Sequence, residues 1–330
     1  MIKGVSIILC TYNGESRLKT TLKHLTFQKH NIPCELIVVD NASVDGTKEF
    51  ADSWWRKNGP KNILYRSFSQ PVPGKSYAQD LGYKKANYEY LLVCDDDNWL
   101  CDTYVQTAFE VMESNSNIGA LGGWCNPAFE SEKPDWFDTY SRFYAVSKQG
   151  IVSGDITNKK GCLYGAGMVI RKSHWQELKT LGFQHLLTCR KGTSLSSGGD
   201  TEYSYALRLL GYKIWFDERL HFKHFMTKPR LSLGYLSRLR KAMAYSNFIL
   251  WPYLDLLCDD KTNFKTHLKL ARRDIPRNPI KQFKLLITGT FEQKELVKFY
   301  YRNVYYIVTQ FSKYKASKAF IKSWLTNKNQ

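Results

Sequence analysis

The feature that most constrains this chain is a set of short, almost continuously apolar runs separated by stretches with helical periodicity. Residues 5–10 and 90–94 are examples, and their length suits a strand rather than a helix. A strand that is apolar along its whole length is buried on both faces, as in parallel sheets covered by helices. We therefore expect an α/β fold with a mostly parallel sheet and helices on both faces. Further strands are expected at 35–39, 63–65, 118–124, 163–170 and 213–216, and helices at 15–27, 46–57, 76–86 and 203–210.

Basic residues are concentrated towards the C-terminus. Residues 1–225 carry 27 Lys and Arg against 24 Asp and Glu, whereas residues 226–330 carry 21 against 6. Strand-like runs also stop near residue 226, so we expect a sheet domain at 1–225 and a helical, basic C-terminal region at 226–330. Such an excess of positive charge attracts an anionic partner, such as a membrane surface, a phosphorylated lipid or nucleic acid.

The sequence contains no apolar run of about 18 residues, the length that would predict a membrane-spanning helix. The N-terminus does not resemble a signal peptide, so we expect a cytoplasmic protein, peripheral at the inner membrane face if the basic region binds lipid. The apolar segment 244–257 has two interpretations: a helix lying in the membrane interface, or a buried helical hairpin packed on the first domain. The eight cysteines form no CxxC pair, which predicts reduced thiols and no zinc site.

Polar clusters follow three of the expected strands. The carboxyl ends of parallel strands meet at one edge of the sheet, where α/β proteins bind ligands. No dinucleotide-binding or P-loop glycine motif accompanies them, which disfavours a Rossmann dehydrogenase and a P-loop hydrolase. The clusters are Thr11, Tyr12 and Asn13 after the first strand, Asp40, Asn41 and Ser43 after the second, and Asp95, Asp96 and Asp97 after the strand at 90–94.

The three adjacent aspartates need a counter-charge, because carboxylates beside a buried strand are costly to leave unpaired. Mg²⁺ and Mn²⁺ bind carboxylate oxygens together with the phosphates of a substrate. We therefore expect a divalent cation at this strand end. A solvated acidic turn is the alternative.

These stretches resemble the family 2 glycosyltransferases, which have the GT-A fold. Four segments match in order, at residues 5–13, 38–47, 94–97 and 198–202, so the resemblance covers about residues 5–230. It implies an inverting enzyme that moves a sugar from a nucleotide-diphosphate donor, with a UDP-sugar favoured, to a hydroxyl of a glycan or lipid-linked acceptor. The Gln-x-x-Arg-Trp signature of processive synthases is absent, which favours the transfer of one sugar per encounter.

The resemblance also implies roles for individual residues. Asp200 would be the general base, although Asp is also a common helix cap, and Gly199 stands where family members often carry Glu. Independently of the resemblance, Lys75 at the expected start of a helix either meets a diphosphate or sugar or is an ordinary solvated lysine. The order of the three aspartates stays open. The implied nucleotide-sugar site comprises Thr11, Tyr12, Asn13, Asp40, Asp95 and Asp96, and the implied ligands of Mn²⁺ or Mg²⁺ are Asp97 and His224.

Two other classes of function stay open at this point. A sugar nucleotidyltransferase of related fold would need a glycine-rich basic loop after the first strand, and the sequence from Thr11 to Glu15 does not look like one. A non-catalytic module could instead bind a membrane or nucleic acid through the basic region. Since no nucleic-acid recognition motif is visible, we expect no nucleic-acid partner.

Overall fold

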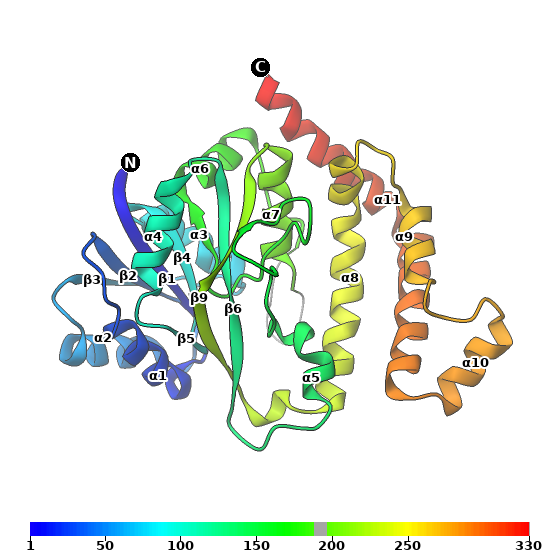
Figure 1. Cartoon of the computed structure of the whole chain (residues 1–330), viewed down its shortest axis with the longest axis horizontal. Helices are drawn as coiled ribbons and strands as arrows, with labels where there is room; N and C mark the ends of the chain where they lie inside the picture. Colours follow the sequence, from blue (N-terminus) through cyan, green and yellow to red (C-terminus); the bar gives the residue numbers. More distant parts are fainter. Residues whose placement is uncertain (188–196, 330) are drawn as a thin grey trace.

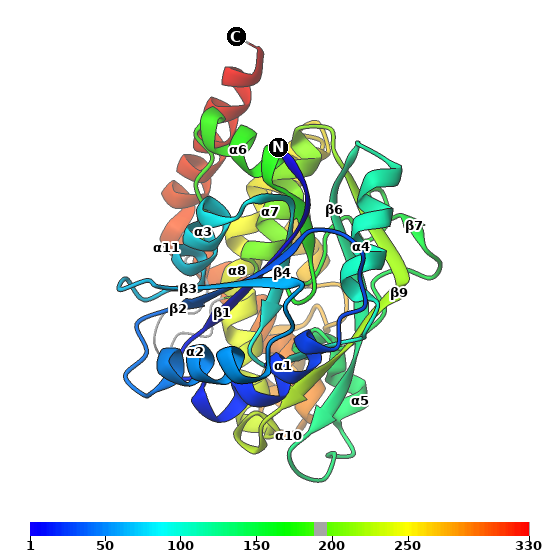
Figure 2. The ribbon, with the colours of Figure 1, turned by 90° about the vertical axis from the view of Figure 1, so that its left-hand side faces the viewer.

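The computed structural model describes residues 1–187 and 197–329, and in these ranges it contains a mixed nine-stranded sheet with helices on both faces (Figures 1 and 2). The strand order is β3-β2-β1-β4-β8-β6-β9-β5, with β7 beside β9. Strands β1 to β4 are parallel, as the apolar runs predict, and their carboxyl ends share one edge. The strands are β1 (Ile2–Thr11), β2 (Cys34–Asp40), β3 (Ile63–Ser69), β4 (Tyr88–Asp95), β5 (Asn98–Leu100), β6 (Ile118–Phe129), β7 (Gly154–Asp155), β8 (Val169–Arg171) and β9 (Lys213–Met226).

The other half of the sheet mixes both directions. Strand β8 is antiparallel to β4 and β6, and β9 is parallel to β6 but antiparallel to β5 and β7. The strand expected at 163–170 is wrong for most of its length, because only β8 at its end pairs in the sheet. Gly161 and Gly167 have φ of 65° and 71°, a conformation that interrupts a strand and turns the preceding segment into a loop.

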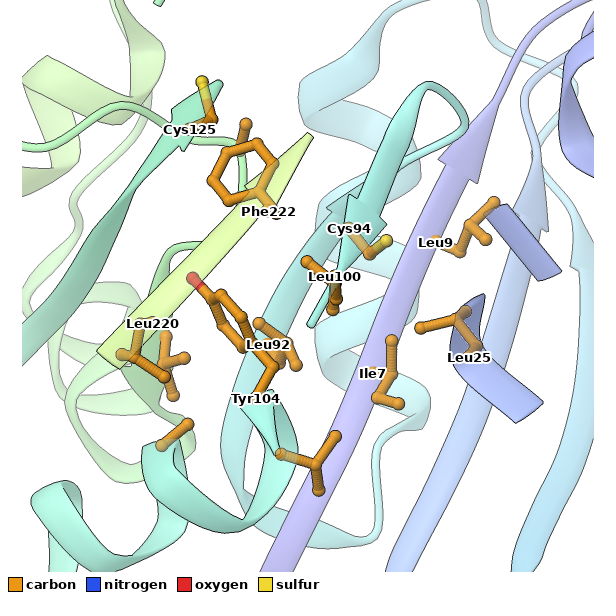
Figure 3. Close-up of a cluster of buried hydrophobic side chains, with 14 of the residues drawn as sticks. Ile7, Leu9, Leu25, Leu92, Cys94, Leu100, Tyr104, Cys125, Leu220 and Phe222 are labelled. Carbon is orange, nitrogen blue, oxygen red and sulfur yellow. The ribbon is translucent and has the colours of Figure 1, made fainter. Parts of the chain in front are cut away.

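Alternation along β1 explains why helices cover both faces of the sheet. Ile7 and Leu9 point to one buried cluster and Ile8 to the other, as expected for a strand with a period of two (Figure 3). The first cluster is covered by α1 (Glu15–Thr26), α2 (Thr47–Asn58) and α4 (Tyr104–Ser114), and the second by α3 (Lys75–Lys85), α6 (Lys172–Leu181) and α7 (Gly199–Leu209).

The basic C-terminal region is helical in its described part, as predicted. It comprises α8 (Leu233–Leu257), α9 (Phe264–Ala271), α10 (Pro279–Thr288) and α11 (Phe291–Thr326), and α8 packs between α7 and α11 (Figure 1). Segment 244–257 is the second half of α8, with Phe248 and Trp251 buried. It is therefore packed on the first domain, but as part of one continuous helix rather than as a hairpin or a helix lying in a membrane.

Cysteines in the described part of the chain are unpaired. Cys10, Cys34, Cys94 and Cys125 are buried as small apolar side chains, and Cys189 lies outside the described residues. None of the helices at 1–187 and 197–329 combines the length and apolar content needed to cross a bilayer.

Candidate active site

A cavity of about 1070 Å³ opens at the carboxyl edge of the parallel strands. The strand register sets this edge: Thr11 pairs with Asp40, and Cys10 pairs with Asp95. Three separate sequence clusters therefore end at the same level of the sheet. Eight of the ten predicted site residues line the cavity, namely Thr11, Tyr12, Lys75, Asp95, Asp96, Asp97, Asp200 and His224.

Asn13 and Asp40 are not among the lining residues, and they differ in what they do. Asn13 adopts a positive φ of 46°, its backbone N–H donates to Ser43, and its side-chain oxygen accepts from the N–H of Val44. It therefore braces the loops after β1 and β2. Asp40 is buried, and its Oδ1 has no hydrogen-bond partner among the described residues. A buried acceptor without a partner is costly, so this oxygen is suited to receive an N–H from a ligand.

Asn41 lines the cavity and fixes the segment before α3. Its Nδ2 donates to the carbonyl of Val72 at 2.8 Å, and its Oδ1 accepts from the N–H of Gly74 at 2.8 Å. Gly74 has φ of 142°, which only glycine adopts readily, and it leads directly into α3. Lys75 is thereby held at the start of the helix, facing the end of β4.

Each aspartate of the triplet pairs with a basic side chain from another element. Lys75 Nζ lies 2.5 Å from Asp95, Arg17 Nη2 lies 2.8 Å from Asp96, and Arg230 Nη1 lies 2.9 Å from Asp97. Basic side chains of the protein therefore neutralise the three aspartates, whereas from the sequence we expected a divalent cation in this role. Burial and the neighbouring Asp97 raise the pKa of Asp96 above its usual value, against the opposing effect of Arg17.

Arg17 and Arg230 are functional candidates that the sequence reading missed. Arg17 lies in the first turn of α1, which begins directly after the loop that follows β1. Arg230 lies in the short 3₁₀ helix Lys228–Arg230, six residues after His224. Their closeness to predicted site segments was the only available signal, since neither belongs to a recognisable motif.

His224 and Asp97 form a pair that could hold a divalent cation. His224 Nδ1 lies 3.1 Å from the carbonyl of Tyr144, which can only accept, so the proton of a neutral ring sits on Nδ1. His224 Nε2 lies 3.3 Å from Asp97 Oδ2, and the carboxylate is stabilised by a positive charge beside it. Arg230 Nη1 provides it, at 2.9 Å from the same Asp97 oxygen and 3.5 Å from Nε2.

The same donor set fits Mn²⁺ or Mg²⁺. A carboxylate oxygen and an imidazole nitrogen are both accepted by Mn²⁺, and Mg²⁺ commonly takes one or two carboxylates plus phosphate oxygens. No group of three His, Cys, Asp or Glu in the described ranges is arranged so that all three could hold one metal ion, so most coordination positions would be left to a ligand. A metal at Asp97 would also require Arg230 to move from the oxygen that it now contacts.

Asp200 lies in the first turn of α7 and lines the cavity. Its Oδ2 accepts from the N–H of Gly165 at 2.6 Å, and its Oδ1 accepts from the N–H of Thr201 at 2.9 Å. A Cβ on Gly165 would approach the side chain of Asp200 to 3.1 Å, so the loop 161–168 comes close because it is rich in glycine. The carboxylate is thus positioned by backbone amides at the cavity wall.

Glu202, the other acid of this segment, is turned away from the cavity. It is fully buried and accepts from the N–H of Leu186 at 2.8 Å and from the hydroxyl of Tyr253 at 3.1 Å. These partners tie α7 to the segment before it and to α8. Glu202 is therefore a structural residue.

Comparison with known proteins assigns the chain to a family. The model of glycosyl transferase family 2 matches residues 6–177. Chondroitin synthase of Escherichia coli is 24% identical over 218 residues, which are 66% of this chain but only 30% of that enzyme. The chain thus spans less than a third of that relative.

Solved structures share the fold at low sequence identity. The mannosyltransferase PcManGT of Pyrobaculum calidifontis, solved with GDP-Man and Mn²⁺, has a TM-score of 0.59 at 15% identity, covering 99% of this chain and 87% of that one. TarS 1–349 of S. aureus with UDP-GlcNAc has a TM-score of 0.52 at 14% identity, covering 98% and 90%. The likeness establishes the GT-A fold, and the family match over more than half of the sequence shows that the chain belongs to glycosyl transferase family 2.

Proposed function

We propose that the protein transfers a sugar from a nucleotide-diphosphate donor to an acceptor hydroxyl with inversion at the anomeric carbon. The observation that carries the proposal is the single cavity that Asp200 shares with the acidic triplet. Such a transfer needs a base and a site for the diphosphate on one cavity, and Lys75, Arg17 and Arg230 beside the triplet supply the positive charge for the second. Asp200 takes the hydroxyl proton, the acceptor oxygen bonds to the anomeric carbon, and the bond from that carbon to the phosphate oxygen breaks.

The donor end of the cavity is assigned by chemistry. Asp40 does not line the cavity itself but lies next to Asn41, which does, and its unpartnered oxygen would accept an N–H of the base, which suits uracil and favours a UDP-sugar. Thr11 and Tyr12 would line the nucleoside, while Asp95 and Asp96 would reach ribose and phosphate. The flanking cations Lys75 and Arg17 would attract the diphosphate.

We assign the metal role to Asp97 and His224. Mn²⁺ or Mg²⁺ bound there would stabilise the negative charge that grows on the leaving diphosphate. The structural neighbour solved with GDP-Man and Mn²⁺ supports a divalent cation in this fold. Arg230, released from Asp97, would be free to contact the same phosphates.

We further propose that residues 1–225 form the donor-binding and catalytic domain and that residues 226–330 contact the acceptor or a membrane surface at the cytoplasmic face. Supporting this division, α10 exposes Ile280, Phe283 and Ile287, at 78%, 64% and 59%, along one side. Basic side chains flank them, and this combination is typical of helices that lie on anionic membranes. The acceptor would then be a glycan or a lipid-linked sugar at that surface, extended by one sugar per encounter.

A donor screen tests the reaction. UDP- and GDP-sugars are incubated with the full chain and Mn²⁺, and release of the nucleoside diphosphate is measured with and without EDTA. We expect at least one donor to be hydrolysed slowly in a metal-dependent manner. Failure of every donor, with nucleotide binding also absent by calorimetry, would overturn the proposal.

A further inference from the structure

The cavity continues beyond the sheet edge into a groove between α8 on one side and α9 with α11 on the other. Figure 1 shows α8 standing between the sheet and these two helices. We use the name helical groove for the part of the cavity lined by Met243, Trp251 and Leu254 of α8, Leu270 of α9, and Leu296 and Phe299 of α11.

The side chains that define the helical groove are apolar, and the polar groups Arg240, Glu292 and His267, which line the same cavity beside them, have partners. Arg240 Nη1 contacts Glu292 at 2.5 Å, and His267 Nε2 contacts Asp255 at 2.8 Å. A glycan chain would need hydrogen-bonding partners along its length, whereas a hydrocarbon chain needs only apolar contact. The groove therefore favours a hydrocarbon occupant.

The helical groove begins beside Asp200. Gly198, two residues before the base, packs against Ser246 and Leu250 on the α8 wall, and all three line the same cavity. An acceptor whose hydroxyl reaches Asp200 can thus extend along α8 into the groove without leaving the cavity.

The far end of the groove opens on the basic, apolar surface of the C-terminal region. Leu270 lines the groove and is also 58% exposed, so it marks the opening. Arg272 and Arg273 follow one residue later and are exposed, and both lie in the sequence that leads to α10. This charge complements an anionic bilayer, and the like charge opposes docking of a second copy of the chain through the same surface.

We propose that the helical groove binds the hydrocarbon chain of the acceptor, an amphiphile that carries the sugar to be extended at the end nearest Asp200. The inference rests on the proposed function, because it identifies the acceptor class of the same site. The sugar would lie at Asp200 and the hydrocarbon chain would leave past Leu270.

Calorimetric binding of farnesyl phosphate to the full chain tests the inference without any donor, at concentrations below micelle formation. We expect saturable binding that inorganic phosphate does not compete away. Leu296→Glu places a charge in the groove and Met243→Trp fills it, so each should weaken binding by at least about 10-fold, equivalent to 1.4 kcal/mol. Val308→Glu is the matched control, because Val308 is an exposed residue of the same helix that does not line the cavity, and its affinity should stay within about two-fold of wild type.

Thermal melts establish that each variant is folded, and Met243→Trp carries the test if Leu296→Glu does not fold. Absence of farnesyl phosphate binding, equal binding by the groove variants, or full displacement by inorganic phosphate would each overturn the groove assignment. UDP affinity is measured in the same samples and should not change. A chain that binds farnesyl phosphate in the groove but cleaves no nucleotide sugar would contradict the proposed function instead.

Discussion

At the scale of single residues, Asp200 and Glu202 show how position separates chemistry from structure. The two acids are two residues apart in the first turn of α7, yet Asp200 faces the cavity and Glu202 is fully buried. Asp200→Asn keeps the size but cannot take a proton, so we predict a loss of transfer of at least about 100-fold, measured as kcat, with nucleotide affinity retained.

Glu202→Gln is the companion variant to Asp200→Asn. It retains the shape but weakens charge-assisted bonds to buried amides, so the melting temperature should fall while the folded fraction keeps most of its kcat. Near-normal turnover in Asp200→Asn would contradict the assignment of Asp200 as the base. Loss of kcat without loss of stability in Glu202→Gln would contradict the structural role of Glu202.

Arg230 leads to a second prediction at this scale, because it contacts the Asp97 oxygen that a metal would need. EDTA or Asp97→Ala should weaken binding of a nucleoside diphosphate. Arg230→Gln should bind Mn²⁺ several-fold more tightly than wild type in the absence of nucleotide, since a competing cation is removed. Calorimetry with Mn²⁺ alone measures the second effect. Equal Mn²⁺ affinity in wild type and Arg230→Gln would show that the arginine does not compete for the site.

The candidate site residues that follow strand ends could be predicted from the sequence. Their basic partners, which come from other elements, could not. Asp95, Asp96 and Asp97 were placed correctly at the cavity because parallel strands bring their carboxyl ends to one edge. Arg17 and Arg230 were missed because pairing of a charge across elements depends on tertiary geometry. Asn13 shows the converse, since its place in a site motif did not reveal that it braces a turn.

At the scale of elements, the segment between α9 and α10 presents basic side chains. Arg272, Arg273 and Arg277 are exposed, and their contacts include Asp274, the backbone and the ring of Tyr300. Reversing the three to Glu should strongly reduce sedimentation with anionic vesicles at low salt, at about 1 kcal/mol per basic residue near the surface, while donor hydrolysis is retained.

The matched control reverses Lys57, Lys61 and Lys84, which are exposed on the first domain and change the net charge equally. Equal vesicle binding by wild type and the folded arginine variant would exclude these arginines as the contact. Equal losses of vesicle binding in the arginine variant and the lysine variant would show that only the overall charge of the protein matters.

Most helices and strands could be predicted from the period of their apolar residues and the length of each segment, and the exceptions have physical causes. The apolar strands β1, β2 and β4 were clear because burial on both faces leaves a continuous apolar run. The loop before β8 resembles a strand in composition, and only the positive φ of Gly161 and Gly167 reveals that it is not one. Proline usually breaks a helix, yet α8 continues through Pro252 because α7 and α11 pack on both sides of α8.

At the scale of the whole molecule, the two regions share one core. Phe248 and Trp251 of α8 and Trp324 of α11 belong to the same buried cluster as Tyr203 and Leu207 of α7. We therefore predict a single thermal transition that coincides by far-ultraviolet circular dichroism and by tryptophan fluorescence. Two separated transitions would show that residues 226–330 unfold independently, despite the shared core.

The pH dependence of global stability offers a further test, centred on one buried histidine. His174 is 7% exposed, its ring stacks on Tyr212 with centroids 3.6 Å apart, and its Nδ1 has no hydrogen-bond partner among the described residues. Burial, reinforced by Arg171, lowers the pKa of His174 from 6.5 to about 4. The folded state therefore excludes a proton that the unfolded chain binds between these two values.

Stability should be complete above about pH 6.5 and fall as the pH drops towards 4, because the unfolded state gains protons first. Between pH 7 and pH 5 this histidine alone should cost about 2 kcal/mol of unfolding free energy, measured by urea denaturation. His174→Phe keeps an aromatic ring on Tyr212 but cannot titrate, so its loss over the same interval should be smaller by about that amount. Burial also lowers the pKa of His24. Because His24 is present in both proteins, its contribution to the pH dependence cancels in the comparison. An identical pH slope in wild type and His174→Phe would mean that His174 takes up its proton without unfolding the chain.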